Sequence, residues 1–399
     1  MKTFSQKSHY DKHLTRKRTC EIQSDKIKEL VDKTVEIKIN ELKKKLNIVE
    51  EKIDQQNQSM SIHNFIEVCA GGGGLSCGLI KAGFTPLLLN DNNNDCCKTL
   101  KKNHPEANVI CGSMDKIDYS SYINKVDLLT GGVPCQSFSQ AGLRKGLSDP
   151  RGDLMYKFIK ILYLIKPKMF MIENVKGLLT HDKGNTIKTI IKALHNCECK
   201  NVIKCDCESK SEYNIVYKCI DASKHDVPQK RERVFIVGTI KTTKKQFEYP
   251  IELSSKKVLK HVLYNVPQSN GAKYNETKIK LFKMIPQGGC WINLPENLQR
   301  EYLGNSYNSG GGRRGILHRL SMEKPSLTLL CTPSQKQTER CHPLEERPLT
   351  IREYARIQTF DDSYEFLGSI ASQYKQIGNA VPVELARQMG IALLKTLEV

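Results

Sequence analysis

One cysteine of this sequence stands where a catalytic nucleophile is expected. Cys135 lies in the segment GGVPCQSFS, directly after the apolar run VDLLT. Glycine and proline on either side of it favour an exposed loop, whereas a structural cysteine normally lies inside an apolar run. A thiol in such a loop can attack an electrophilic carbon and form a covalent intermediate. We therefore predict that Cys135 is a nucleophile.

Charged side chains follow or precede two other apolar runs. Glu173 and Asn174 come directly after MFMI, and a buried carboxyl with a raised pKa can donate a proton to a substrate ring nitrogen. Arg231 and Arg233 precede VFIVG and share one face of a strand. Guanidinium groups there suit phosphate or carbonyl recognition, although a solvated edge strand has the same pattern. We predict that Glu173, Arg231 and Arg233 act with Cys135.

A glycine-rich turn predicts a cofactor site. The run CAGGGG follows the apolar stretch FIEV and precedes a helix-like segment, an arrangement in which glycine lets the backbone approach a cofactor closely. A tight connection without a ligand would explain the glycines alone. Asp91, however, ends the next apolar run, PLLLND, where an acid can hold the two ribose hydroxyls of a nucleoside cofactor.

The elements that must position these residues form a regular alternation. From Asn64 onward, apolar runs alternate with helix-like segments, which predicts βαβ units and a doubly wound, mostly parallel α/β sheet. Ligands of such sheets bind at the carboxyl ends of the strands. We expect a basic helical arm over 1–60, a catalytic and cofactor-binding domain over 61–240, a small irregular second domain over 241–345, and a segment over 346–399 that returns to the catalytic domain.

The arm contains a heptad pattern. Its apolar positions are spaced 4, 3, 4, 3 and 4 residues apart and are Val35, Ile39, Leu42, Leu46, Val49 and Ile53. Such a seam predicts either a short coiled coil that pairs two chains or an amphipathic helix packed on its own catalytic domain. Both alternatives are open from the sequence.

Composition and charge indicate where the protein acts and which class of partner it binds. The 399 residues carry a formal charge of +19, with a pI near 9.2, which favours a polyanionic partner such as nucleic acid. No apolar run approaches the length of a membrane span, so we expect a soluble, intracellular, DNA-associated protein with no membrane partner. Four of the 15 cysteines form a weak candidate for a zinc site, although a reduced loop is expected because their C-x-C spacing is tight. They are Cys197, Cys199, Cys205 and Cys207.

The ordered segments AGGGGLSCGL, GGVPCQSFSQAG, ENV, QKRERVFIVG, RPLTIREYARIQTF and QIGNAVP span about 64–399. Together they resemble the motif set of the DNA (cytosine-5) methyltransferases. The resemblance implies an S-adenosylmethionine-dependent methyltransferase fold with a small target-recognition domain. It also implies that Cys135 attacks C6 of a flipped-out cytosine while Glu173 engages N3, and that the methyl group of S-adenosylmethionine goes to C5. Arg231 and Arg233 would hold the base or the adjoining phosphate.

The resemblance also implies a set of cofactor contacts. They are Glu67, Cys69, Ala70, Gly71, Gly73, Gly74, Leu75, Asp91, Ser113, Met114, Pro134, Asn379 and Val381. The sequence departs from the family pattern at three of these positions. Glu67 replaces an aspartate and Cys69 an aromatic residue, while Ser113 stands where an aspartate often contacts the adenine. Asp115, two residues further on, is the candidate to replace that aspartate.

Substrate contacts are expected next to the motifs and in the second domain, which would read the target in the major groove. They are Gln136, Ser137, Asn174, Gln229, Arg313, Arg314, Lys336 and Arg340. Double-stranded DNA is the expected partner, with a second copy of the chain and a cognate restriction endonuclease as further candidates. Two alternatives remain: the same chemistry on tRNA, and a non-catalytic regulatory homologue, which would normally have lost the catalytic residues.

Overall fold

The computed structural model describes residues 28–45 except 29 and 37, and residues 63–134, 154–195, 212–308, 315–336 and 339–398. The chain divides into two compact units, Met1–Ser61 and Ile62–Val399. Several predicted site residues lie outside the described part: Cys135, Gln136, Ser137, Cys197, Cys199, Cys205, Cys207, Arg313 and Arg314.

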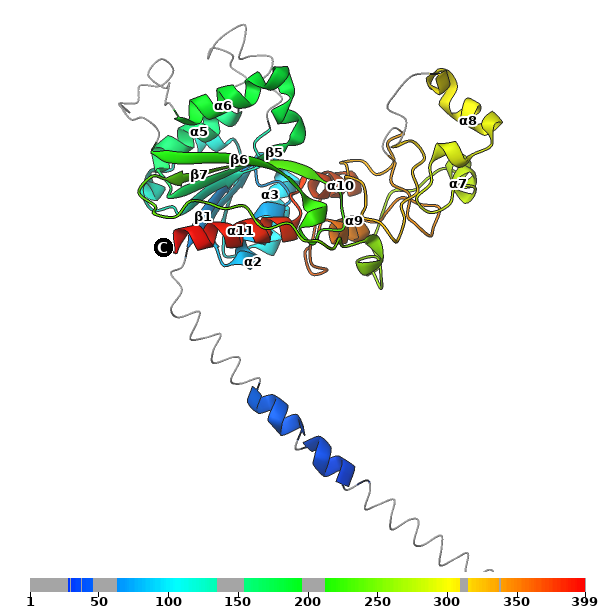
Figure 1. Ribbon diagram of the computed structural model, residues 1–399, viewed down its shortest axis with the longest axis horizontal. Helices are drawn as coiled ribbons and strands as arrows, with labels where there is room; N and C mark the ends of the chain where they lie inside the picture. The colour runs from blue at the N-terminus through cyan, green and yellow to red at the C-terminus, as the bar shows by residue number, and fades with distance from the viewer. Residues whose placement is uncertain are drawn as a thin grey trace, which may run out of the picture. The chain divides into compact units, whose positions relative to one another are not determined.

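A single seven-stranded sheet organises the described part of the second unit, in the order β3-β2-β1-β4-β5-β7-β6 (Figure 1). Its strands are β1 (Asn64–Val68), β2 (Thr85–Asp91), β3 (Asn108–Cys111), β4 (Leu128–Gly131), β5 (Met169–Val175), β6 (Tyr213–Asp221) and β7 (Glu232–Ile240). β1 to β5 pair in parallel, whereas β7 runs antiparallel to both β5 and β6. The predicted mostly parallel sheet is confirmed, and the reversed strand is β7.

Helices cover both faces of this sheet. α2 (Gly74–Ala82), α3 (Asn94–Asn103) and α11 (Val383–Leu397) share one apolar cluster with the sheet, and α5 (Leu154–Ile165) and α6 (Asn185–His195) share the other. Figure 1 shows the two layers on opposite sides of the strands. The predicted doubly wound α/β architecture is therefore confirmed.

The C-terminal helix returns to the first helix of the sheet. α11 and α2 approach closely at Gly78, where an added methyl group would collide with Cβ of Ala386 and lie 2.5 Å from the carbonyl oxygen of Val383. Only a residue without a side chain allows the two backbones to approach in this way. The last part of the chain thus completes the layer that begins directly after β1.

The residues after β7 first stay on the sheet and then form a core of their own. Phe247 and Tyr249 still pack against the sheet cluster. A separate apolar cluster then extends from Tyr274 to Cys341 and includes Trp291; it contains α7 (Glu276–Lys283) and α8 (Glu296–Leu303). α9 (Ile351–Ile357) and α10 (Ile370–Asn379) join a third cluster that leads back to α11.

The described residues of the first unit, between 28 and 45, are helical. Val35, Ile39 and Leu42, which form the first half of the heptad seam, are exposed by 50%, 45% and 61%. The other seam residues, Leu46, Val49 and Ile53, lie outside the described part. Within the residues described, no helix combines the length and the apolar character needed to cross a membrane.

The close contact between α2 and α11 predicts a specific sensitivity. Gly78→Ala should lower the free energy of unfolding by up to about 2 kcal/mol, because an overpacking cost of up to roughly 3 kcal/mol exceeds the gain in helix propensity of about 1 kcal/mol. Urea unfolding followed by circular dichroism measures this. Gly177→Ala is the matched control, because its added methyl group meets nothing closer than 4.0 Å. Equal stability of the two variants would contradict the close packing.

Candidate active site

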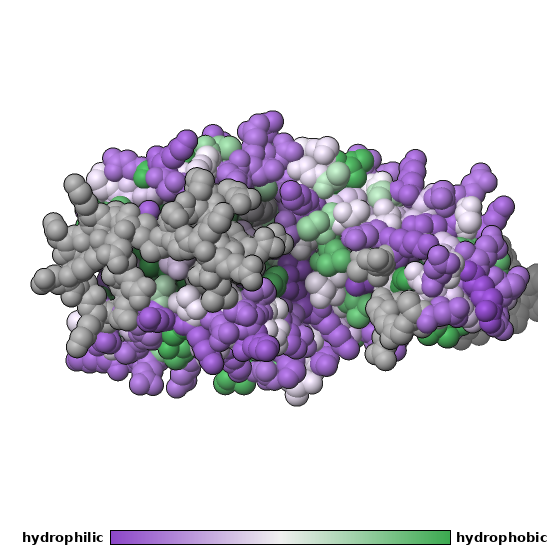
Figure 2. Space-filling model, turned by 90° about the horizontal axis from the view of Figure 1, so that it is seen from above, coloured by the Kyte–Doolittle hydropathy of each residue, from purple (hydrophilic) through white to green (hydrophobic). Residues whose placement is uncertain are grey.

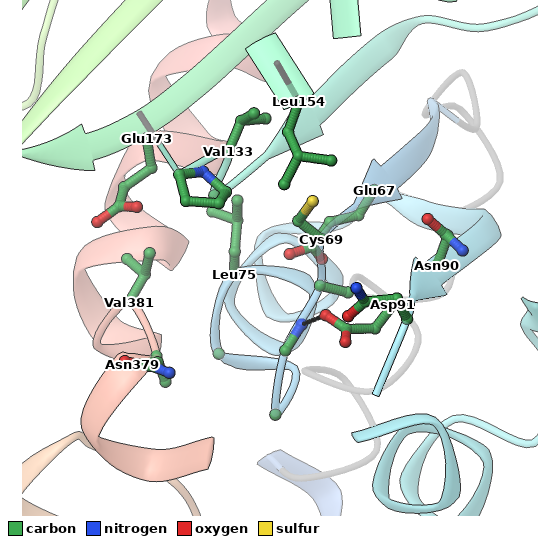
Figure 3. Close-up of a pocket in the computed structure, with 18 of the residues that line it drawn as sticks. Glu67, Cys69, Leu75, Asn90, Asp91, Val133, Leu154, Glu173, Asn379 and Val381 are labelled. Atoms are coloured by element: carbon green, nitrogen blue, oxygen red, sulfur yellow. Dashed lines mark hydrogen bonds between the residues drawn. The ribbon is translucent and has the colours of Figure 1, made fainter. Parts of the chain in front are cut away.

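The carboxyl ends of the parallel strands open onto a cavity of about 510 Å³ (Figure 3). Most of the predicted cofactor residues line it: Glu67, Cys69, Ala70, Gly71, Gly74, Leu75, Asp91, Ser113, Met114, Pro134, Asn379 and Val381. Glu173, Asn174 and Arg233 line the same cavity. The structure therefore brings the residues expected to hold a cofactor and the residues expected to hold a substrate base into one space.

The glycine-rich turn after β1 has a conformation that requires glycine. Gly71 and Gly73 have φ angles of 56° and 83°, in the left-handed region. Gly73 does not line the cavity; a side chain there would collide with the hydroxyl of Tyr364, which donates a hydrogen bond of 3.0 Å to the carbonyl of Gly72. A side chain on Gly74 would collide with the carbonyl oxygen of Val381. The turn is thus fixed by segments from the far end of the chain.

Asp91 holds this turn from the neighbouring strand. Its Oδ2 accepts a hydrogen bond of 2.8 Å from the backbone N–H of Gly71, and its Oδ1 accepts one of 2.8 Å from the N–H of Asn93. The first of these bonds is drawn in Figure 3. Asp91 is the last residue of β2, as expected from the sequence, and it also lines the cavity.

Glu67 is a buried acid inside the cavity wall. Its side chain is only 1% exposed, and its Oε2 has no hydrogen-bond partner among the residues described. Burial raises the pKa of its carboxyl to about 8, and the nearby carboxylates of Asp91 and Glu173 add to this effect. An unpartnered buried acceptor of this kind is suited to a cationic ligand or to a ligand with a hydrogen-bond donor.

Ser113 and Asp115 have different positions. Ser113 lines the cavity, and its hydroxyl donates to the carboxylate of Asp115, which does not line it. Lys157 pairs with the same carboxylate at 2.9 Å, and these hydrogen bonds lower the pKa of Asp115 to about 2. Asp115 is therefore engaged by α5, and Ser113 is the one of the two that faces the cavity.

Glu173 and Arg233 form an ion pair in the cavity. Nε of Arg233 lies 2.9 Å from Oε1 of Glu173, which is 8% exposed. The antiparallel pairing of β7 with β5 accounts for the pair, because it sets the start of β7 beside the end of β5. Burial raises the pKa of the Glu173 carboxyl, while the charges of Arg233 and Arg231 oppose that rise.

Asn174 connects this pair to the residues that precede Cys135 in the sequence. Its Nδ2 donates a hydrogen bond of 2.7 Å to the carbonyl of Val133, two residues before the cysteine. Val133 and Pro134 line the cavity, and Cys135 is the next residue along the chain. Val133 is thus fixed beside Asn174, the residue that follows Glu173.

Other predicted contacts lie away from the cavity. Arg231 is 1% exposed and Gln229 is fully buried, and both bond to groups of the chain itself. Arg340 is 7% exposed and donates to the carbonyl of Glu339. Lys336 is exposed and lies over the ring of Tyr302. Their roles as substrate contacts stay predictions.

The cavity also contains residues that the sequence analysis did not identify. Asn90 precedes Asp91 in β2 and donates to the carbonyls of Ile110 and Gly112, which joins the ends of β2 and β3. Its position at a strand end was a usable signal. Leu154 also lines the cavity, at the start of α5, and no pattern in the sequence distinguishes it from the other leucines.

Comparison with known proteins agrees with this geometry. The family model described as C-5 cytosine-specific DNA methylase matches residues 63–395. The chain is 44% identical over 355 residues to the Type II methyltransferase M.Eco47II of Escherichia coli, covering 86% of this chain and 82% of that protein. It is 42% identical over 339 residues to the Type II methyltransferase M.Sau96I of Staphylococcus aureus, covering 83% and 76%.

Solved structures share the fold. The Dnmt2 methyltransferase of S. pombe aligns with a TM-score of 0.60 at 14% identity, covering 85% of this chain and all of that one. A putative prophage-encoded DNA modification methyltransferase of E. coli also aligns with a TM-score of 0.60, at 21% identity, covering 84% of this chain. Similarity at these identities concerns the fold, while the family match covers the cavity and both sets of residues around it. The chain belongs to the C-5 cytosine-specific DNA methylase family.

Proposed function

We propose that this protein methylates C5 of a cytosine within one short sequence of double-stranded DNA, with Cys135 as the nucleophile. The observation that supports this most directly is the shared cavity. It is lined by the glycine-rich turn and Asp91, by the Glu173–Arg233 pair, and by the two residues that precede Cys135. A cofactor and an extruded base can therefore meet there.

The chemistry needs a nucleophile and an acid on the same ring. Cytosine C6 is a poor electrophile until the ring is polarised, so the Cys135 thiolate forms a bond to C6 as the Glu173 carboxyl gives its proton to N3. A carboxyl whose pKa is raised by burial retains that proton nearer neutral pH. C5 of the resulting neutral enamine is nucleophilic and takes the methyl group. Loss of the C5 proton to solvent, departure of the thiolate and return of the N3 proton to Glu173 restore the ring.

Two neighbours position the acid and the chain that leads to the nucleophile. Arg233 holds one oxygen of Glu173 and leaves the other for the base. Asn174 fixes the carbonyl of Val133, two residues before Cys135. Positioning of this kind replaces an improbable encounter by a preset geometry, which is a large part of enzymatic rate enhancement.

The cavity also fits the family cofactor. S-adenosylmethionine supplies the methyl group from a cationic sulfonium centre when it is bound. Glu67, Asp91 and Glu173 give the cavity three carboxyl groups, and the unpartnered Oε2 of Glu67 is available to a cationic or hydrogen-bonding part of the ligand. Gly71 leaves open space where a side chain would stand, since nothing lies within 4 Å of a methyl group placed there. We infer that Asp91 holds the ribose and Glu67 the charged end.

Glu67 makes the stability of the cofactor-free protein dependent on pH. Its folded pKa of about 8 lies above its ordinary value of 4.5, so its contribution to stability is present at low pH and is lost as the pH rises through 8. Between pH 7 and 9 the wild type should lose roughly 1 kcal/mol of unfolding free energy more than Glu67→Gln does. Chemical unfolding at both pH values measures this, with the exposed Glu301→Gln as control. Identical losses in wild type and Glu67→Gln would contradict a protonated Glu67.

The reaction itself is tested on plasmid DNA. Purified protein with S-adenosylmethionine should protect cytosines at one short sequence from bisulfite conversion. Cys135→Ala should reduce that methylation by about a thousandfold or more, because the covalent step is lost. Cys219→Ala, on β6, is the control and should retain activity. Methylation of tRNA instead of DNA would favour the RNA alternative, and no methylation of either would favour a non-catalytic homologue.

Target reading belongs to residues 241–345, which hold the exposed Lys336 and, outside the described part, Arg313 and Arg314. Hydrophilic side chains cover most of the described surface on the face drawn in Figure 2. The formal charge of +19 favours a partner with a phosphate backbone. The relatives named as Type II methyltransferases suggest a cognate restriction endonuclease that cuts the same sequence.

The arm pairs two chains. Val35, Ile39 and Leu42 are exposed on the helix between 28 and 45 and continue a heptad seam in the sequence. Removal of residues 1–58 should convert a dimer into a monomer in light scattering and leave methyl transfer within about twofold. Ile39→Asp should have the same effect, whereas the off-seam Glu41→Gln should not. A full-length monomer would contradict pairing, and loss of soluble protein on truncation would make the arm part of the core.

A further inference from the structure

Two side chains of the QKRER segment have no access to the cavity. Gln229 is fully buried and Arg231 is 1% exposed, and only Arg233 of this segment lines the cavity. A buried guanidinium or amide needs hydrogen-bond partners within the protein. The partners of Gln229 and Arg231 therefore indicate what these residues do.

The first set of partners lies in residues 326–331, near the end of residues 241–345, which we call the second region. Gln229 forms a parallel bridge with Ser326, and its Oε1 accepts a hydrogen bond of 3.0 Å from the N–H of Leu329. Nη1 of Arg231 donates to the carbonyl of Leu329 at 3.3 Å. Both side chains thus bind the backbone of this segment.

The same segment is tied to the interior of the second region by Arg340. Its Nη2 donates to the carbonyl of Thr328 at 3.4 Å and its Nη1 to that of Glu339 at 2.8 Å. The fully buried Glu339 accepts a hydrogen bond from the N–H of Leu317 and pairs with Lys278 of α7. A displacement within the second region can therefore reach residue 328 through fixed polar contacts.

The second set of partners lies at the C-terminal end of α10, which forms part of the cavity wall. Nη2 of Arg231 donates to the carbonyls of Gly378 and Asn379, at 2.9 and 3.2 Å. Nε2 of Gln229 donates at 2.9 Å to Oε1 of Gln358, whose own Nε2 donates to the carbonyls of Ile377 and Ala380 at the same helix end. Since Asn379 lines the cavity, these bonds end at the cofactor site.

The two partner segments also touch directly. The thiol of Cys331 lies 2.9 Å from Oδ1 of Asn379, to which it donates. A side chain on Gly378 would lie 2.5 Å from the carbonyl oxygen of Leu330. Close-packed contacts without intervening space transmit a displacement instead of absorbing it.

The charge of Arg231 makes the loss of these hydrogen bonds energetically unfavourable. Its Nε has no hydrogen-bond partner among the described residues, so the carbonyls at its two Nη atoms are its principal polar contacts. Burial lowers the pKa of Arg231 to about 9, and the charge of Arg233 adds to this effect, whereas Glu173 stabilises the cation. Separation of either segment would leave a buried cation with fewer partners, which is strongly unfavourable.

We propose that Gln229 and Arg231 are positioning residues that couple the second region to the cofactor wall, so that target DNA and cofactor bind cooperatively. The proposal rests on the proposed function in that the DNA must bind the second region. Occupancy of that region fixes residues 326–331, which fix the end of α10 at Gly378 and Asn379. By reciprocity, a filled cofactor site favours the DNA-bound arrangement to the same extent.

The test measures the coupling itself. Calorimetry gives the Kd of S-adenosylhomocysteine, the unreactive product, with and without a saturating duplex that carries the sequence mapped by bisulfite. For the full-length wild type, the Kd without the duplex should be about fivefold or more higher than the Kd with it, and we call this quotient the ratio. In Arg231→Lys it should fall below about twofold, because one ammonium cannot hold three carbonyls in a planar fork. Cys331→Ala, at a partly exposed position that should not affect folding, should lower the ratio partially.

Arg300→Lys is the matched control, since Arg300 is an exposed arginine of α8 whose side chain pairs with Glu296; it should keep the wild-type ratio. Coupling unchanged in both Arg231→Lys and Cys331→Ala would overturn the proposal, and Cys331→Ala decides alone if Arg231→Lys does not fold. The proposal would also be overturned if the wild type methylates the duplex but binds S-adenosylhomocysteine with the same Kd whether or not the duplex is present. A wild type that methylates no DNA would instead overturn the proposed function.

Discussion

The site depends on the contact between the glycine-rich turn after β1 and the turn that precedes α11. At Gly74 the carbonyl of Val381 occupies the space of a side chain, and at Gly73 the hydroxyl of Tyr364 does so. These contacts join residues separated by some three hundred positions of the chain and add a wall from its C-terminal part to the cavity. The strand ends alone would form an open edge, on which a cofactor would be held from one side only.

The reversed strand has an equally specific effect. Because β7 runs antiparallel beside β5, it delivers Arg233 to Glu173, whereas a parallel strand would place its first residues at the other end of the sheet. The acid is thereby neutralised in part without exposure to water. A buried carboxyl with one oxygen engaged and a pKa raised by desolvation is the form that proton donation to a base requires.

The sequence predicts much of this arrangement and fails at identifiable points. Apolar runs, the glycine turn and the acids at strand ends carry local signals, so the sheet and the positions of Asp91 and Glu173 could be predicted. Burial of a polar side chain has no such signal: Arg231 and Arg233 are two residues apart, yet one binds backbone carbonyls and the other lines the cavity. Arg340 is of a residue type that often contacts DNA, yet its side chain is buried like that of a core residue. Such differences arise from tertiary partners distant in sequence.

The position of α11 has a consequence for the order in which the protein is made. Ribosomes release the strands and Cys135 first, but α2 and the adjoining face of the sheet lack their cover until residues 383–397 have emerged. The wall formed by Asn379 and Val381 arrives equally late. A nascent chain that already contains every proposed catalytic residue therefore has an unfinished cofactor site and an exposed apolar face, and it is a substrate for chaperones and proteases before it is an enzyme.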